Sequence, residues 1–294
     1  MIRFKNLTKR YESGKGIFDF SFEVEEGEVF GLIGPKESGK STALRMLMGF
    51  EDCTKGRCAI NGKDCVKDSL SLHKIMGYLP QHFSLPGDLT GKQFLRSMAQ
   101  MRRIRNLERM FELSLKLDVE LEQKIGKMSR MDVKKVGLIC AMMHNPQVLL
   151  LDQPFGYLDE KARSVLVNLI LEEKEKNRMV ILTTDSVTGA DLTCDRVALL
   201  DRGNVAYIGD METLRENMYR DFMIQFGSSR TAMQFSKEEF EIRTMKDRSV
   251  VVTIQGEMGA LIKALSGYDV TSIEPVPMKL DEAFVHIYGG RVYA

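Results

Sequence analysis

One short segment near the N-terminus constrains the fold of this chain more than any other feature. Residues 34–42 read Gly-Pro-Lys-Glu-Ser-Gly-Lys-Ser-Thr, which satisfies the pattern G-x-x-x-x-G-K-[ST]. The apolar run Val29–Ile33 precedes the segment, and an expected helix, Lys40–Gly49, follows it. Backbone N–H groups and a helix N-terminus converge in such a strand–loop–helix unit, so it binds phosphate groups. The sequence therefore predicts an α/β sheet that carries a phosphate-binding loop, in preference to a tight turn without a ligand.

The residue types in this loop suit a nucleoside triphosphate. Lys40 is expected to reach the β- and γ-phosphates, and the Ser41 hydroxyl is expected to ligate Mg²⁺. The residues that we expect to surround the phosphates are Gly34, Pro35, Lys36, Glu37, Ser38, Gly39, Lys40, Ser41 and Thr42.

A second motif lies well downstream of the loop. Val148–Leu151 is an apolar run that leads into Asp152. A buried strand of this kind places the carboxylate at its C-terminal end, where ligands gather in open α/β sheets. Asp152 is then expected to hold the metal through its water shell. An apolar strand that ends in Asp is weak evidence alone, and the phosphate loop upstream makes it strong.

The rest of the chain indicates two domains. Short β-rich runs alternate with helical patterns up to about residue 217, which predicts a parallel-rich α/β core. Within this part, residues 89–145 predict a helical subdomain, and we interpret its clustered arginines as a solvated face in preference to a docking patch. Residues 218–294 predict a small α+β accessory domain. The arginines in question are Arg102, Arg103, Arg105 and Arg109. The expected strands are Val29–Ile33, Ala59–Ile60, Ile75–Leu79, Val148–Leu151, Val180–Thr184, Val197–Leu200, Asp221–Phe226, Val250–Ile254 and Asp269–Ile273. The expected helices are Lys40–Gly49, Glu160–Lys176, Gly189–Cys194, Met258–Leu265 and Leu280–Ile287.

Composition excludes several classes of protein. Lys and Arg number 42 against 41 Asp and Glu, so the net charge gives no attraction to nucleic acid or anionic lipid. No run approaches the roughly 20 apolar residues of a membrane-spanning helix, and the basic N-terminus lacks the apolar core of a signal peptide. The five cysteines include no C-x-x-C pair, which argues against a disulfide framework or a zinc site. These features predict a soluble, cytosolic chain.

With both motifs in place, about residues 1–217 resemble the ATP-binding cassette (ABC) transporter ATPases. The matching segments are Leu7-Thr8-Lys9-Arg10-Tyr11, Gly77-Tyr78-Leu79-Pro80-Gln81-His82, Leu158-Asp159, Cys194-Asp195-Arg196-Val197 and Asp201-Arg202-Gly203. The resemblance implies ATP and Mg²⁺ as cofactors, and a cassette fold in which an antiparallel β part joins the parallel core. It assigns Tyr11 to the adenine, and Gln81 to the metal and to sensing a transmembrane partner. It also places the Leu158-Asp159 pair in a loop that crosses a dimer interface.

The C-terminal segment carries a weaker resemblance. Pro277–Val285 is similar to the closing segment of ATPases from ABC-2 type drug- and antibiotic-resistance exporters. A short amphipathic helix that closes a domain would look alike. The exporter assignment therefore rests on less than the cassette assignment does.

Several positions depart from the family pattern. Gln153 replaces the glutamate that activates water, and an amide cannot accept the proton. Asp185 replaces the switch histidine, and its carboxylate would repel the γ-phosphate. Glu37 replaces a glycine of the phosphate loop, where its side chain could point to solvent. These changes affect hydrolysis more than binding.

The signature segment, which in this family contacts the partner's nucleotide, is altered as well. Ser129 is kept as a possible helix cap and phosphate ligand, whereas Arg130 and Met131 stand where glycines are usual. A deliberate Glu→Gln change, which traps bound nucleotide, would explain only Gln153, so we favour natural degeneration. The sequence thus predicts a cassette that binds MgATP with Tyr11 and the loop residues but hydrolyses it poorly.

The resemblance also implies partners. Cassettes of this family work as head-to-tail dimers on an integral-membrane transporter subunit. In a homodimer both sites would combine the same replacements, so we favour a heterodimer with a hydrolytic cassette, held at the inner face of the cell membrane. No nucleic-acid partner is expected. Two alternatives stay open: a fully active transport ATPase, and a soluble non-transport ABC protein that acts on ribosomes or DNA. Proteins of that last class usually carry paired cassettes or coiled-coil arms, which this sequence does not show.

Overall fold

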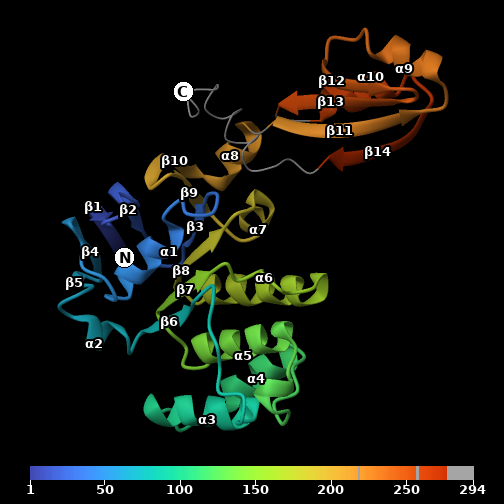
Figure 1. Ribbon diagram of the computed structural model, residues 1–294. Helices are drawn as coiled ribbons and strands as arrows, with labels where there is room; N and C mark the ends of the chain where they lie inside the picture. Colours follow the sequence, from blue (N-terminus) through green and yellow to red (C-terminus); the bar gives the residue numbers. More distant parts are fainter. Residues whose placement is uncertain (218, 256–257, 277–294) are drawn as a thin grey trace. The chain divides into compact units, whose positions relative to one another are not determined.

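The computed structural model describes residues 1–217, 219–255 and 258–276 (Figure 1). The chain divides into two compact units, Met1–Gly209 and Asp210–Ala294. This division falls a few residues before the boundary expected after residue 217, and independent folding of residues 1–217 stays a prediction. The expected helix Leu280–Ile287 and the exporter-like segment Pro277–Val285 lie outside the described residues.

The first unit is built on a ten-stranded sheet with the order β5-β4-β1-β2-β10-β9-β3-β8-β7-β6. One side of it is antiparallel: β1 (Ile2–Arg10), β2 (Gly16–Val24), β4 (Lys55–Ile60) and β5 (Lys63–Asp64). The other side is parallel: β3 (Val29–Ile33), β6 (Met76–Leu79), β7 (Val148–Asp152), β8 (Met179–Thr184) and β9 (Arg196–Asp201). Between the two sides lies β10 (Asn204–Asp210), which pairs with β2 in parallel. The predicted parallel-rich core with an antiparallel part is confirmed.

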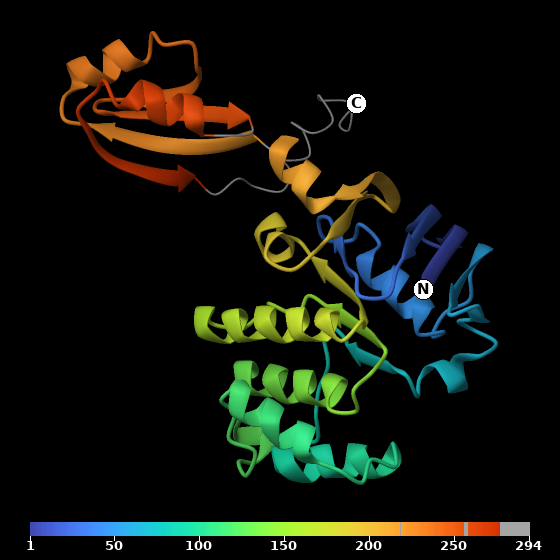
Figure 2. The ribbon, with the colours of Figure 1, turned by 180° about the vertical axis from the view of Figure 1, so that it is seen from behind.

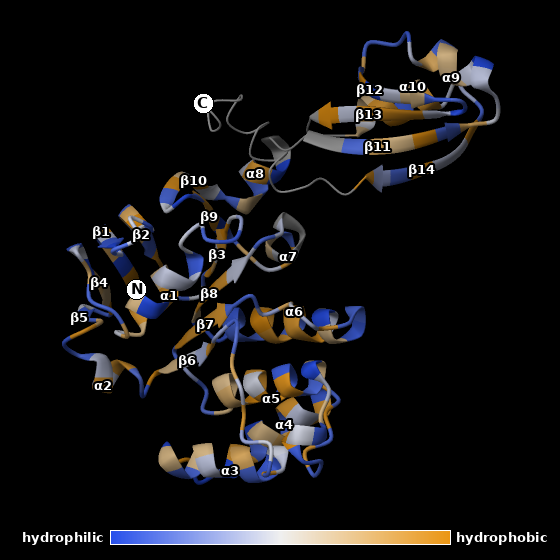
Figure 3. Ribbon diagram, viewed as in Figure 1, coloured by the Kyte–Doolittle hydropathy of each residue, from blue (hydrophilic) through white to orange (hydrophobic). Residues whose placement is uncertain are grey.

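The parallel strands form because their residues suit burial on both faces. Every residue of β3, β7 and β8 is buried, as expected for parallel strands covered from both sides, and Figure 3 shows these strands mainly in the hydrophobic colours. The core continues into α1 (Lys40–Leu47), whose Leu44 and Leu47 are fully buried. Phe22 of β2 stacks on Phe30 of β3 with ring centroids 4.9 Å apart. This packing fixes the strand that leads into the phosphate loop.

Three strands of the antiparallel side, β1, β2 and the two-residue β5, were not predicted, and irregular pairing explains why β1 and β2 were missed. The pairing of β1 with β2 shifts register between Phe4 and Leu7. Near that shift, Asn6 and Asp19 have φ angles of 48° and 55°, and the Asn6 side-chain amide donates to the Asp19 carboxylate at 2.9 Å. Such bulges insert an extra residue and break the two-residue period by which a strand is recognised in sequence.

Helices cover the sheet and form a separate lobe (Figures 1 and 2). The lobe contains α3 (Gly91–Met101), α4 (Glu108–Lys116), the short 3₁₀ turn η1 (Ile125–Lys127) and α5 (Arg130–Met142), within the range expected to be helical. Next to it lies α6 (Glu160–Glu175), and the remaining helices of this unit are α2 (Ser69–Leu72) and α7 (Val187–Asp191). The α7 helix begins two residues before the predicted start at Gly189.

One expectation for the lobe is wrong. Arg109 was expected on a solvated face, but its side chain is only 11% exposed and forms ion pairs with Glu112 at 2.8 Å and Glu173 at 2.7 Å. Because Glu173 belongs to α6 and Arg109 to α4, the pair joins the lobe to the helix that packs on the sheet. A buried glutamate requires such a partner.

The second unit has the β-α-β-β-α-β order of ferredoxin-like domains. After α8 (Met211–Asn217) come β11 (Tyr219–Phe226), α9 (Ser229–Phe235), β12 (Glu241–Lys246), β13 (Ser249–Gln255), α10 (Gly259–Leu265) and β14 (Val270–Val276). The strands form an antiparallel sheet in the order β12-β13-β11-β14. Its core contains Ile224, Phe235, Val252 and Leu261, all fully buried. The prediction of a small α+β unit is confirmed.

The helices described above are too short or too polar to cross a lipid bilayer, for the three ranges of residues that the structure describes.

Candidate functional site

The predicted site residues meet at one edge of the sheet, because four neighbouring parallel strands end there. In register, Leu79 of β6 lies opposite Leu151 of β7, and Asp152 lies opposite Thr183 of β8. The phosphate loop follows β3, which is the other neighbour of β8. Gln81 and Asp185 therefore leave the sheet beside Asp152 and the loop. This edge is where ligands bind in open α/β sheets.

The phosphate loop turns sharply onto α1. Gly39 takes a φ of 101° directly before the helix, which has no side-chain cap. A Cβ on Gly34 would lie 2.3 Å from the carbonyl oxygen of Leu200, so only glycine fits there. The Lys40 ammonium folds back over the loop and donates to the carbonyl oxygens of Gly34 and Pro35, each at 2.7 Å. These contacts hold the Lys40 ammonium beside the N-terminus of α1.

Electrostatics make Lys40 an unusual lysine. Its residue is 6% exposed, and burial lowers the pKa of its ammonium to about 8 against the opposing effect of the Asp185 and Asp152 carboxylates. Both carboxylates thus lie close enough to Lys40 to act on its charge. The hydrogen bonds of this ammonium become stronger when charged phosphate oxygens replace the neutral carbonyl oxygens as acceptors, because hydrogen bonds between charged groups are the stronger kind.

Glu37 turns away from the loop, as its sequence position allowed. It has a φ of 65°, and its carboxylate accepts a hydrogen bond from Lys15 at 2.5 Å in an exposed ion pair. Lys36 is exposed as well, and Ser38 is buried, with its hydroxyl 3.4 Å from the Lys40 ammonium. The glycine replacement at Glu37 therefore leaves the inner face of the loop unobstructed.

Tyr11 lies beside the first turn of α1. Its hydroxyl donates to the Glu51 carboxylate at 2.5 Å and is 3.5 Å from the Thr42 hydroxyl. Burial and the neighbouring Glu51 raise the pKa of the phenol. The same glutamate binds Arg45 at 2.9 Å, so the ring is anchored to the helix that carries the loop. Its contact with adenine stays a prediction.

Asp152 and Gln153 share one hydroxyl. Thr183 donates its hydroxyl proton to the Asp152 carboxylate at 2.6 Å, and the Gln153 backbone N–H donates to that same hydroxyl oxygen at 2.9 Å. Asp152 is 2% exposed. Gln153 has a φ of 50°, so its backbone bends immediately after the strand. The carboxylate and the residue after it are thereby fixed relative to each other.

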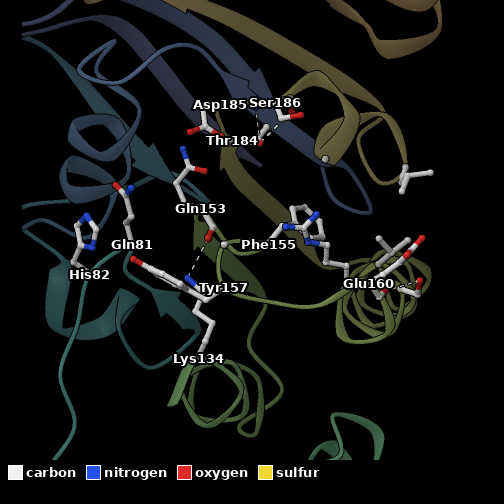
Figure 4. A pocket seen from close by; sticks show the side chains of 16 residues that line it. Gln81, His82, Lys134, Gln153, Phe155, Tyr157, Glu160, Thr184, Asp185 and Ser186 are labelled. Carbon is white, nitrogen blue, oxygen red and sulfur yellow. Dashed lines mark hydrogen bonds between the residues drawn. The ribbon is translucent and has the colours of Figure 1, made fainter. Parts of the chain in front are cut away.

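A cavity of about 600 Å³ opens in front of these residues, and Gln81, Gln153 and Asp185 line it. Figure 4 shows the amides of Gln81 and Gln153 extending toward the side of the cavity where Asp185 lies. The cavity thus brings together both replaced catalytic positions and one predicted metal ligand.

The predicted metal ligands suit Mg²⁺. Asp152, Ser41 and Gln81 offer a carboxylate, a hydroxyl and an amide oxygen, and hard oxygen donors are what Mg²⁺ prefers. The described part of the chain holds no group of three or more His, Cys, Asp or Glu side chains that could enclose a metal. A small number of protein ligands is consistent with Mg²⁺, because this ion is usually held by only one or two carboxylates together with substrate phosphates.

The signature residues lie elsewhere in the unit. Ser129 caps α5: its hydroxyl oxygen accepts from the Asp132 N–H at 3.1 Å, and its hydroxyl proton goes to the Asp132 carboxylate at 2.7 Å. The Arg130 guanidinium lies 5.8 Å from the ring centroid of Tyr157. Ser129, Arg130 and Met131 do not line the cavity of Gln153, although Arg130 lines a smaller cavity together with Gln81 and Lys134. Figure 1 shows the α5 helix, which this segment begins, in the helical lobe and apart from α1 and its phosphate loop.

Three residues near the site were missed by the sequence analysis. Thr183 is a buried polar residue at the end of an apolar strand, and that interruption was a usable signal. Tyr157, with a φ of 66°, occupies a loop whose neighbours Leu158 and Asp159 were identified. Lys134 gave no signal, because a Lys-Lys pair in a helix reads as surface. In fact Lys134 is 3% exposed, and its ammonium donates to the Gln153 carbonyl oxygen at 3.1 Å.

Comparison with known sequences places these features in context. Residues 17–156 match the family model described as ABC transporter. The chain is 32% identical over 222 residues to an uncharacterized ABC transporter ATP-binding protein of Methanocaldococcus jannaschii, covering 74% of this chain and 80% of that protein. A second uncharacterized ABC transporter ATP-binding protein, from Bacillus subtilis, is 26% identical over 296 residues, which cover 98% of this chain and 96% of the relative. A probable multidrug ABC transporter ATP-binding protein of Escherichia coli is 32% identical over 231 residues, and the chain spans 39% of its length.

Solved structures agree with the sequences. An ATP-binding subunit of an ABC transporter superimposes with a TM-score of 0.67 at 26% identity, covering 73% of this chain and 92% of that structure. A dimeric bacterial ABC transporter cassette gives a TM-score of 0.61 at 26% identity, covering 72% and 99%. These similarities confirm the predicted cassette fold.

Proposed function

The chain belongs to the ABC transporter family as an ATP-binding subunit, and on that premise we propose that it binds MgATP well and hydrolyses it poorly. In this proposal, nucleotide binding drives or regulates a separate membrane subunit. The observation that carries it is a contrast within one site. A fully formed phosphate loop and a buried Asp152 stand beside an amide, Gln153, at the position of the catalytic base.

We assign binding to the loop and its neighbours. The loop N–H groups and Lys40 hold the phosphates, and the Tyr11 ring stacks under the adenine, since stacking needs only an exposed aromatic face. Ser41, Gln81 and Asp152 hold the magnesium ion. When bound, that ion neutralises charge on the phosphates. Residues 1–217 make up this domain in the proposal, and residues 218–294 are accessory to it.

Hydrolysis is the weak half of the proposed activity. The Gln153 amide cannot accept a proton from water, and a positioned general base contributes typically 10²–10⁴-fold, or roughly 3–5 kcal/mol of barrier. Asp185 adds a second obstacle, because it lines the same cavity as Gln153 and its carboxylate would repel the γ-phosphate. Its charge acts on Lys40, which supports a location close to the phosphates.

A membrane subunit is the proposed partner. Phe50 and Met101 expose 54% and 77% of their surface. The Phe50 ring lies 5.9 Å from the His73 ring and 6.0 Å from the Tyr78 ring, centroid to centroid, and Arg102, next to Met101, donates to the His73 carbonyl oxygen at 3.1 Å. This exposed apolar and aromatic surface supports docking at the cytoplasmic face of a membrane protein. The similarity to a probable multidrug transporter subunit supports export as the direction.

A second cassette completes the proposed assembly. One solved relative is described as dimeric. In a homodimer every site would contain Gln153, Asp185 and the replaced signature. We therefore propose a heterodimer with a hydrolytic cassette. In it, the site on this chain's phosphate loop binds MgATP without a base, while the site on the partner's phosphate loop keeps the partner's own glutamate and faces Arg130 and Met131.

Phosphate release tests the proposal. The parent, Gln153→Glu, Asp185→His and the double variant are compared with the membrane subunit present, and nucleotide affinity is measured for each. We expect tight MgATP binding in all four, slow turnover in the parent, little recovery in either single variant and more in the double variant, because groups that act as a unit are non-additive. A parent that already releases phosphate as fast as the double variant would contradict impaired hydrolysis. A parent without MgATP affinity would contradict the binding role.

A further inference from the structure

We propose that Lys134 is a positioning residue that fixes the backbone at Gln153 through a single hydrogen bond and so ties α5 to the catalytic position. The inference rests on the proposed function, because it assigns Gln153 to the site of hydrolysis. It goes further by naming the residue through which the helical lobe sets the direction of that side chain.

The backbone of Gln153 is held from both ends. Its N–H donates to Thr183 at 2.9 Å, and its carbonyl oxygen accepts from the Lys134 ammonium at 3.1 Å. Figure 4 shows Lys134 reaching from α5 to this carbonyl while the Gln153 amide extends into the cavity. The same carbonyl also accepts the Gly156 N–H at 3.3 Å. A φ of 50° is unfavourable for a residue with a side chain, so these contacts hold Gln153 in a conformation that it would not keep alone.

Stability does not explain a lysine at this position. Lys134 is 3% exposed and forms no ion pair with any residue that the structure describes. Burial lowers the pKa of its ammonium to about 8, with only the Asp152 carboxylate opposing that shift. Replacing buried charge by well-packed apolar groups is often neutral or stabilising. A retained buried cation of this kind therefore points to a role in the site.

Lys134 also lies where three parts of the unit meet. Its ammonium is 6.0 Å from the centroid of the Phe83 ring, two residues beyond Gln81. A Cβ on Gly137 would lie 2.5 Å from that ring, so Phe83 rests directly on α5. The helix thus contacts the segment of Gln81 and the carbonyl of Gln153 within one turn. Because α5 begins at the signature residues, a shift of its first turn reaches Gln153 through Lys134.

The chain offers a matched control one residue away. Lys135 is 5% exposed, and its ammonium donates to the carbonyl oxygen of Asp118, also at 3.1 Å. It has the same burial, helix and type of hydrogen bond, but its acceptor lies in the lobe. Any general loosening of α5 would therefore appear in a Lys135 variant as well.

The experiment measures hydrogen–deuterium exchange in the full-length chain, by mass spectrometry of peptides that cover residues 152–158. Lys134→Met removes the donor and keeps an unbranched side chain one atom shorter than lysine, Lys134→Gln keeps an uncharged donor at that same shorter length, and Lys135→Met is the control. We expect exchange in these peptides to rise by about 10–10²-fold in Lys134→Met, as losing one hydrogen bond from a charged donor implies. We expect parent-like exchange in the other two, and an unchanged or raised Tm for Lys134→Met. Lys134→Ala replaces Lys134→Met should the latter fail to fold.

A kinetic readout follows in the Gln153→Glu, Asp185→His double background, where the side chain at 153 can act as a base and turnover is expected to recover. There Lys134→Met is expected to lower kcat about tenfold with KM for MgATP unchanged, because misplacing a catalytic group affects the chemical step, while Lys134→Gln keeps kcat. Parent-like exchange in Lys134→Met overturns the proposal. So does fast exchange in Lys134→Gln, which would make charge the cause, or in Lys135→Met. The exchange measurement does not require ATP hydrolysis. Failure of the proposed function can therefore be distinguished from failure of the positioning role of Lys134.

Discussion

Two helices of the first unit begin at functional segments, and one of them has a capped N-terminus whereas the other does not. The α1 helix starts after Gly39 with no side-chain cap and no acidic residue in its first turn. The α5 helix starts after Ser129, whose hydroxyl bonds the Asp132 N–H, and Asp132 adds a carboxylate to that first turn. Every helix N-terminus presents unsatisfied N–H groups and partial positive charge. In α1 these groups stay available to an external anion, and in α5 the chain's own side chains satisfy them.

The two termini separate a binding role from a structural role within one chain. The α1 terminus has no side-chain cap, so its N–H groups can bind phosphate. The α5 terminus uses Ser129 for stability, and its exposed Arg130 rests near Tyr157. The comparison predicts that changes at α1 alter nucleotide affinity strongly, whereas changes at α5 alter the stability of the isolated chain.

Substitution of Lys40 should change nucleotide affinity most. Lys40→Ala removes two charge-assisted contacts to phosphate, each contributing roughly 1.5–3 kcal/mol, so MgATP affinity should fall by about 10²–10⁴-fold. Calorimetric titration measures it. Lys36→Ala, an exposed lysine of the same loop, is the control and should bind like the parent. Unchanged affinity in Lys40→Ala would remove the basis for treating α1 as the phosphate-binding terminus.

A smaller effect is expected from pH. The Lys40 pKa of about 8 in the free protein means that its ammonium is fully protonated below about pH 7 and is lost as pH rises through 8. MgATP affinity should therefore be constant at low pH and fall above pH 8, by at most about tenfold per unit. Titrations from pH 6.5 to 9.5 test this. Lys134 has a pKa of about 8 too, so Lys134→Met should keep the same dependence. A flat profile in the parent would argue against a role for the Lys40 charge.

The smallest effect is expected at Ser129. Ser129→Ala removes the cap of α5, which costs about 1 kcal/mol, or a fall in Tm of about 2–4 °C for a domain of this size. MgATP affinity of the isolated chain should not change, because this terminus does not face the chain's own phosphate loop. Thermal melts with and without MgATP separate the two quantities. A loss of affinity without a change in Tm would reverse the roles assigned to the two helices.

The sequence was most informative where function imposes short-range patterns. The phosphate loop, Asp152 and the strands around them follow from spacing and apolar runs, and parallel strands then bring Gln81 and Asp185 to the same edge. The strands β1 and β2 were missed because the bulges at Asn6 and Asp19 break the two-residue period of the sequence. The position of such a bulge depends on the pairing with the neighbouring strand. The role of Lys134 could not be predicted for another reason. Its partner is the backbone carbonyl of Gln153, and because every residue has a backbone carbonyl, the sequence does not indicate which one a lysine contacts. The assignments to adenine, Mg²⁺ and a second cassette stay predictions.

The doubly held backbone at Gln153 has a consequence for the history of the chain. Thr183 and Lys134 bind the main chain and leave the side chain unconstrained, so glutamate, which has nearly the same shape as glutamine, fits the same φ without rearrangement. The two residues are one nucleotide apart in the genetic code, as are aspartate and histidine at position 185. Drift at these positions is therefore reversible at the level of single point mutations, because the scaffold that a carboxylate base requires persists whichever side chain it carries.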